Sequence, residues 1–303
     1  MTIPNFGKFA LALGLIVPLV CLQFYLGLVL PISSSLFNSD SGVYDAGTRS
    51  RLTYGLTVIH CKESMARMDW INYLPKEWKV TVYETCGQSI SPFSQPFENG
   101  GSEECSAYLN TMIEQYKDPY LPDINLFVQS DVLLAGGRKS KQLIHEHSPF
   151  YNITDLVSTV QTWAENGGKF LHFGPKFGRP LEKIADDWHF QKDFPRQIMD
   201  VVERNYTSES FFETRSGACF AVHKDRILAN SADMYVKLKE KQLSFKGDNL
   251  NTRKFCCAFE CSWHAFLGEP FILPYNSSVD HIWHERVQEL PGGWSHQLQN
   301  STI

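Results

Sequence analysis

The stretch "INLFVQSD", Ile124 to Asp131, decides the fold class. Its middle is continuously apolar rather than alternating, which is typical of a strand in a sheet that is covered on both faces. Gln129, Ser130 and Asp131 follow at the carboxyl end of this strand, where open α/β sheets bind their ligands. We therefore expect a buried strand that presents Gln129 and Asp131 to a substrate.

Strand and helix patterns alternate on both sides of this stretch. Short β-rich runs predict strands at 55–61, 79–85 and 169–174. Apolar residues spaced at threes and fours predict helices, which we place at 63–74, 102–116, 155–166, 223–243 and 257–268. This alternation indicates one layered α/β domain over 53–290 with a mostly parallel, Rossmann-like sheet, followed by a tail at 291–303.

The N-terminal segment predicts a membrane anchor. From Phe9 to Ile32 the chain carries no charge over twenty-four residues, and about 20 apolar residues span a bilayer. The alternative is a cleaved signal peptide, whose apolar core is usually about 7–15 residues long. Lys8 precedes the run and favours a cytosolic tail at 1–8 with the remainder in the lumen. With a polar stem at 33–52, the layout is that of a single-pass type II protein of the Golgi or ER membrane.

Sequons and cysteines favour a lumenal domain. N-x-[ST] sequons, which accept N-linked glycans, occur at Asn152, Asn205, Asn276 and Asn300. Seven cysteines follow the predicted anchor and are candidates for disulfides in an oxidising compartment: Cys61, Cys86, Cys105, Cys219, Cys256, Cys257 and Cys261. Zinc held by the last three is a weaker alternative, because the chain contains no CxxC pair.

The charge pattern excludes one class of partner. The net charge is −5, and Lys and Arg are spread along the chain rather than clustered. Nucleic-acid binders carry a concentrated basic surface. We therefore expect no nucleic-acid partner.

The stretch "FECSWHAFLG" carries the first catalytic candidates. Glu260, Trp263 and His264 are three and four residues apart, so a continuous helix would bring them onto one face. A carboxylate beside an indole and an imidazole can act as a general base. The alternative from spacing alone is a buried helix with a packed tryptophan and a hydrogen-bonded histidine.

Three other motifs are weaker. Gly100 and Gly101 lead into a helix as a phosphate-binding loop would, but Glu103 and Glu104 already complement the helix dipole there. The chain has no strict D-x-D motif, so dependence on Mn²⁺ or Mg²⁺ stays open. The pair His145 and His147 has a spacing seen at metal sites and would suit a hydrolase.

Several of these motifs together resemble the domain of unknown function 3431 family. They are Asp69-Trp70, "GGSEECSAYLNTMIEQY", "LPDINLFVQ", "GACFAVHKDRIL" and E-x-x-W-H, and they span about Thr57 to Gly268. The resemblance marks as matching positions Trp70, Glu104, Tyr108, Leu109, Asp123, Gln129, Gly217, Phe220, Val222, Glu260, Trp263 and His264. One position departs from the family pattern, which usually continues Gln129 with Gly-His where this chain has Ser130 and Asp131.

The layout of that family is similar to glycosyltransferases of the GT-A type. The resemblance implies transfer of a sugar from a nucleotide sugar to a glycan or glycoprotein acceptor. Glu260 is then expected to be the general base, with His264 orienting it. The remaining expected substrate contacts are Gln129 and Asp131 near the diphosphate, Trp263 on a sugar ring, and Glu104 and Trp70. The alternative function is a non-catalytic lumenal module that binds glycans or partner enzymes.

Overall fold

The helices and strands described below all belong to the unit Arg51–Ile303. The structure, a computed structural model, describes residues 51–60, 68–85, 94–96, 104–118, 120–130, 132–133, 150, 152–174, 176–180, 191, 193–204, 211–215, 218–245, 249–271 and 279. None of the helices formed by these residues is long and apolar enough to cross a membrane. The predicted anchor at 9–32 lies outside them, and so does the predicted stem at 33–52 apart from Arg51 and Leu52.

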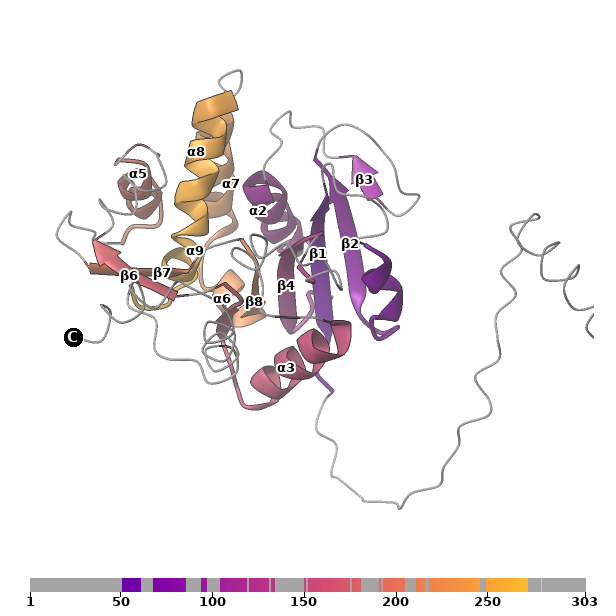
Figure 1. Cartoon of the computed structure of the whole chain (residues 1–303). Helices are drawn as coiled ribbons and strands as arrows, with labels where there is room; N and C mark the ends of the chain where they lie inside the picture. Colours follow the sequence, from indigo (N-terminus) through magenta and orange to yellow (C-terminus); the bar gives the residue numbers. More distant parts are fainter. Residues whose placement is uncertain are drawn as a thin grey trace, which may run out of the picture. The chain divides into compact units, whose positions relative to one another are not determined.

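A six-stranded sheet forms the centre of this unit, in the order β3-β2-β1-β4-β8-β5 (Figure 1). Its strands are β1 (Tyr54–His60), β2 (Lys79–Glu84), β3 (Ser94–Pro96), β4 (Ile124–Gln129), β5 (Phe170–His172) and β8 (Phe220–His223). The first four strands in chain order are mutually parallel. A separate antiparallel pair consists of β6 (Lys176–Pro180) and β7 (Phe211–Arg215).

The α/β class is confirmed, whereas the sheet is mixed. β8 lies between β4 and β5 and runs antiparallel to both. The sequence did not predict this strand, because a four-residue apolar run fits a strand or a buried helix and carries no sign of direction. Its orientation follows from the next step of the chain, since the N–H of Lys224 donates to Asp123 O at the amino end of β4.

Helices cover both faces of the sheet, as the continuously apolar strands predict. They are η2 (Asp69–Tyr73), α2 (Glu104–Gln115), α3 (Ile153–Glu165), α5 (Phe194–Val201), α6 (Lys224–Leu228), α7 (Ala232–Leu243), α8 (Asn249–Glu260) and α9 (Trp263–Phe266). The expected helix over 223–243 is two helices, because the Ser231 side chain accepts from the N–H of Met234 and starts α7 anew. The expected helix over 257–268 is also interrupted, between Glu260 and Trp263.

Successive residues of each strand enter two different cores. Leu56, Val58 and Leu126 pack with residues of η2 and α3 in one hydrophobic cluster, which we call the α3 face. Ile59 and Phe127 pack with residues of α2, α5, α7, α8 and α9 in the other, which we call the α2 face. Side chains that alternate along a strand point to opposite faces, so the two clusters lie on the two sides of the sheet.

A charged network holds the amino edge of the sheet. The N–H and Oγ1 of Thr53 donate to Asp123 Oδ2 at 2.9 and 2.8 Å. Lys224 Nζ lies 2.7 Å from Asp123 Oδ1. Partial burial raises the pKa of Asp123, but the hydrogen bonds from Lys224 and Thr53 outweigh it and lower the pKa to about 2. The network therefore joins β1, β4 and the start of α6.

Candidate functional site at the carboxyl edge of the sheet

The order of the parallel strands creates a switch point between β1 and β4. After β1 the chain proceeds to β2 and β3 on one side, and it then returns to β4 on the other side of β1 (Figure 1). The connections that follow β1 and β4 thus leave in opposite directions. Open α/β sheets bind ligands outside the carboxyl ends of strands at such a point, which places the candidate site beside His60 and Gln129.

A buried pair of titratable side chains lies at this edge. His60 ends β1 and Glu84 ends β2, and the two residues are register partners. His60 Nδ1 lies 2.5 Å from Glu84 Oε2, and each side chain is only 1% exposed. If the carboxylate is ionised it can only accept, and the ring nitrogen is then the donor in this contact. Within the described residues, the second oxygen of Glu84, Oε1, is buried without a hydrogen-bond partner.

Ser130 extends this row on the other side of His60. Its N–H donates to Ile59 O at 2.9 Å, so it continues β4 by one residue beside β1. The Ser130 side chain is fully buried, and its Oγ has no hydrogen-bond partner in the described part of the chain. By alternation Glu84, His60 and Ser130 follow Val82, Val58 and Val128 onto the α3 face. Three polar side chains therefore end three neighbouring strands on one face.

Trp70, one of the expected substrate contacts, lies against this row. It belongs to η2 and is 7% exposed. Its Nε1 donates to Ser130 O at 3.0 Å. The indole thus fixes the backbone at the end of β4, and it does so from the α3 face.

Gln129 turns toward the other face. The Gln129 side chain is half-buried, and by alternation it follows Phe127 and its register partner Ile59 onto the α2 face. Its backbone N–H donates to Cys219 Sγ at 3.4 Å. His172, at the carboxyl end of β5, is 4% exposed and accepts the N–H of Gly174 at Nδ1. Asp131 lies outside the described residues, as do His145 and His147. The predicted donor contacts are therefore placed only for Gln129.

The E-x-x-W-H motif occupies the core of the α2 face. Because α8 ends at Glu260 and α9 begins at Trp263, the expectation of one continuous helical face is wrong. Trp263 is fully buried against the rings of Tyr108, Phe220, Phe259 and Phe266. The indole has no exposed surface, so in this position it packs within the core and does not contact a sugar ring. This placement matches the alternative of a packed tryptophan.

His264 and Glu260 differ from each other in exposure. His264 is 1% exposed, and its Nε2 lies 3.3 Å from Phe271 O. Glu260 is half-buried and stands at the end of α8. Of the two expected catalytic side chains, the carboxylate is thus the one with solvent contact.

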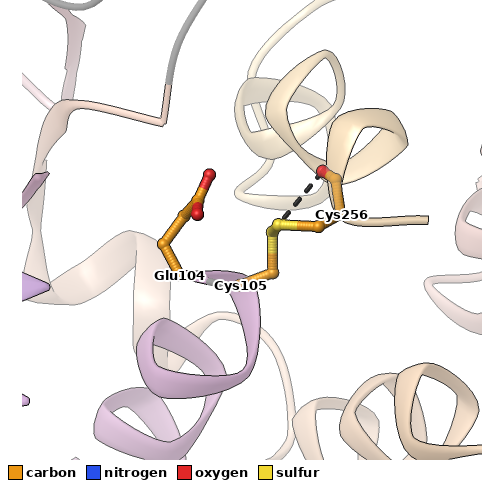
Figure 2. Close-up of side chains that lie close together, drawn as sticks. All are labelled: Glu104, Cys105 and Cys256. Carbon is orange, nitrogen blue, oxygen red and sulfur yellow. Dashed lines mark hydrogen bonds between the residues drawn. A yellow bond between two sulfur atoms is a disulfide. The ribbon is translucent and has the colours of Figure 1, made fainter. Parts of the chain in front are cut away.

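A second cluster joins α2 to α8. Figure 2 shows Glu104, Cys105 and Cys256, whose sulfur and carboxylate atoms all lie within 4.8 Å of one another. The two sulfurs form a disulfide with a Cα–Cα distance of 5.7 Å. Joined sulfurs are not thiolates, and thiolates are the form in which cysteine binds zinc. The predicted disulfide chemistry is confirmed at this pair, and the zinc alternative, which needed Cys256, is wrong.

The predicted site residues do not converge on one place. Trp70 packs in the cluster of the α3 face, whereas Trp263 and Cys105, next to Glu104, pack in the cluster of the α2 face. Glu104 is 8% exposed at the start of α2. The pattern of the sequence thus found residues on both sides of the sheet and assigned them to one active site.

Comparison with known proteins identifies the family. A family model described as "Protein of unknown function (DUF3431)" matches residues 58–279. The chain belongs to the DUF3431 family. The matched span begins in β1 and includes both the switch point and the E-x-x-W-H motif, which confirms the resemblance drawn from the motifs. No curated protein and no solved structure matches the chain.

Sequence reasoning missed His60 and Glu84, although a signal was present. Each is a polar residue at the end of a β-rich run, in "GLTVIHC" and "KVTVYET". The same reading had singled out Gln129 and Asp131 after the third strand. Applied to all three parallel strands, it would have found the row, because the carboxyl ends of parallel strands share one edge.

Proposed function

We propose that this DUF3431 protein is a glycosyltransferase of the secretory pathway, with a GT-A-like domain that transfers a sugar from a nucleotide sugar to a glycan or glycoprotein. The observation that carries the proposal is the switch point between β1 and β4, where polar side chains of three parallel strands meet. Nucleotides bind α/β sheets at this position. The donor would lie across the ends of β1, β2 and β4.

The donor contacts in this proposal are Gln129 and Asp131, with Trp70 and Glu104 as further substrate contacts. A divalent cation, Mn²⁺ or Mg²⁺, would bridge the diphosphate in enzymes with a D-x-D motif, which this chain lacks. The cofactor is therefore left open, and transfer without a metal would need cationic side chains on the leaving phosphate.

On the acceptor side, Glu260 is the proposed general base and His264 the residue that orients it. Glu260→Gln keeps the size of the side chain and removes the proton acceptor. General-base catalysis contributes about 10²–10⁴-fold, so we expect sugar transfer to fall by that order with donor binding intact. Unchanged turnover and unchanged melting would refute the assignment. If Glu260 only holds the end of α8, melting falls before activity does.

A nucleotide-binding experiment distinguishes the proposed glycosyltransferase from the alternative function. A non-catalytic lumenal module that binds glycans or partner enzymes is favoured by one observation, the burial of Trp263 and His264. The test is a thermal-shift screen of the full chain in mild detergent against nucleotide sugars, with and without Mn²⁺. A ligand at 100 times its Kd adds about 2.7 kcal/mol to the free energy of unfolding. No shift with any nucleotide sugar would favour the binding module.

The proposed location is the Golgi or ER membrane, with a type II anchor at 9–32 and the domain in the lumen. The Cys105–Cys256 disulfide supports it, because disulfides persist in oxidising compartments. Proteolysis of sealed microsomes checks the topology, since a lumenal domain is protected until detergent is added. A domain degraded in sealed vesicles would contradict the proposal.

Asn152 is an available acceptor among the four proposed glycosylation sites. It is exposed at the start of α3, and its Oδ1 accepts the N–H of Asp155 at 2.9 Å. A glycan attaches to Nδ2, so the capping oxygen would keep its bond. The sites at Asn205, Asn276 and Asn300 lie outside the described residues. Endoglycosidase should lower the apparent mass, and by one glycan less in Asn152→Gln.

A further inference from the structure

Glu84 carries a carboxylate oxygen that the fold does not use. Oε2 is held by His60 at 2.5 Å, whereas Oε1 is buried and lacks a hydrogen-bond partner within the described residues. A buried polar atom without a partner costs about 1–3 kcal/mol. Such an atom in a native structure calls for an explanation, and an absent ligand or water is one.

A second such atom lies on the same face. Ser130 Oγ is also buried without a partner within the described residues, and it ends β4 on the far side of His60 from Glu84. Neighbouring strands are about 4.8 Å apart, so Glu84 and Ser130, two strands apart, are separated by about twice that distance. The row therefore offers a carboxylate acceptor and a hydroxyl on either side of one imidazole.

The position of Glu84 suggests which ligand uses it. In α/β sheets that bind dinucleotides, an acidic residue about 20 residues beyond the first strand–helix turn accepts a hydrogen bond from the ribose hydroxyl. Glu84 lies 24 residues after His60, at the carboxyl end of the strand next to β1. The glycine fingerprint that binds a pyrophosphate is missing after β1 in "HCKESMAR". The likeness to dinucleotide-binding sheets therefore covers the position that binds the ribose. It does not cover the loop that binds the diphosphate.

We propose that Glu84 Oε1, held in place by the contact between His60 and Oε2, accepts hydrogen bonds from the ribose hydroxyls of the donor, with Ser130 Oγ as a neighbouring contact. The donor is then a ribonucleotide derivative, recognised by its diol. This inference rests on the proposed function, since it assumes a nucleotide at the switch point. Glu84 and Ser130 are ligand contacts in this proposal, and His60 is a positioning residue.

The test compares two forms of one nucleotide on the full chain in mild detergent. Isothermal titration is carried out with UDP and GDP, and then with the 2′,3′-dideoxy form of the nucleotide that binds. Hydrogen bonds to a charged group contribute enough that we expect the ribose form to bind at least about tenfold more tightly. Glu84→Gln should reduce this ratio toward one. Glu165→Gln, at the exposed end of α3, is the matched control and should keep the ratio.

The outcomes separate the two proposals. Equal binding of the ribose and dideoxy forms to the unaltered chain overturns the ribose contact and leaves the proposed function standing. A ratio that persists in Glu84→Gln overturns the role of Glu84. If neither UDP nor GDP binds, with or without Mn²⁺, the proposed function fails and the ribose contact fails with it. If Glu84→Gln does not fold, equal binding of the ribose and dideoxy forms to the unaltered chain still overturns the proposal.

Discussion

On the α3 face, the carboxyl edge of the sheet ends in the polar side chains of Glu84, His60 and Ser130, whereas the α2 face is filled by aromatic rings. Phe220 stacks on Phe127 at 5.0 Å and packs against Trp263 at 5.3 Å. The α3 face thus ends in a row of buried polar side chains, and the α2 face keeps a packed core with a covalent tie. Buried polar atoms without a partner among the described residues occur on both faces, for example Trp78 Nε1 and Trp263 Nε1. Under the proposed function, we assign ligand binding to the α3 face and most of the stability to the α2 face.

Removal of the disulfide is the largest expected loss. The Cys105–Cys256 bond joins α2 to α8 across 151 residues. Removing a native disulfide typically costs about 2–5 kcal/mol, and we expect the Cys105→Ser, Cys256→Ser variant to lose that much in urea unfolding. Nucleotide binding at the α3 face should persist in the variant that still folds. Loss of binding without loss of stability would reverse the division between the two faces.

A pair of tryptophan substitutions compares the faces directly. Trp263 on the α2 face and Trp78 on the α3 face are both buried, and neither indole N–H has a hydrogen-bond partner in the part of the chain that the structure describes. Trp263 contacts several rings, whereas Trp78 stacks on Tyr54 at 5.0 Å. Trp263→Phe should cost about 1–3 kcal/mol, and Trp78→Phe should cost less. Thermal melting of the two variants is the measurement, and equal losses would contradict the comparison.

Asp123, at the amino edge of the sheet, makes a pH-dependent contribution to the free energy of unfolding. It lies away from the two clusters compared above. The pKa of Asp123 is lowered from 3.8 to about 2 in the folded chain. A depressed folded pKa stabilises the fold above the unfolded pKa, and this contribution is lost as the pH falls through the folded pKa. We expect a loss of at most about 2 kcal/mol between about pH 5 and pH 2. Urea unfolding across this range should show a flatter profile in Asp123→Asn, and an unchanged profile would refute the role of Asp123.

Ser130→Ala should have the smallest effect on stability. Unlike the variants above, it should stabilise the fold. The Ser130 hydroxyl is buried without a partner among the described residues, so its removal relieves a desolvation cost. We expect the free energy of unfolding to rise by up to about 1 kcal/mol. Thr57→Ala, a buried hydroxyl further back on β1, is the comparison. A clear loss of stability in Ser130→Ala would show that its Oγ is satisfied by water in solution.

The strands and helices that the sequence predicted share one property. In each of them the pattern of apolar residues extends over enough residues to be recognised. α2 and α3 were found from helical patterns of apolar residues, β1 and β4 from apolar runs, and β2 from a period of two. β8 was missed because four residues carry too little pattern. The break after Glu260 was missed because nothing in the local sequence competes with a helix there, and burial of Trp263 among rings far apart in the chain determines it.

The site was predictable where chemistry follows a strand end and not where it depends on which face a residue takes. Gln129 lies at a strand end as expected, and Trp70, whose position the sequence did not predict, lies at the same edge but on the opposite side of the sheet. A one-residue step along a strand changes the face. Which face a given residue points to depends on how its strand is paired with the neighbouring strands. That pairing register links residues far apart in the chain, so a local pattern does not reveal it.

The place of β8 between β4 and β5 has a consequence for synthesis. Ribosomes make the chain from its N-terminus, so β4 and β5 both emerge before the strand that joins them. About ninety residues separate Gln129 from Phe220, which corresponds to on the order of 5–20 s of elongation. During this interval one edge of β4 presents unpaired N–H and C=O groups, and exposed strand edges recruit other chains. Binding of that edge by a chaperone until β8 arrives would protect the nascent protein.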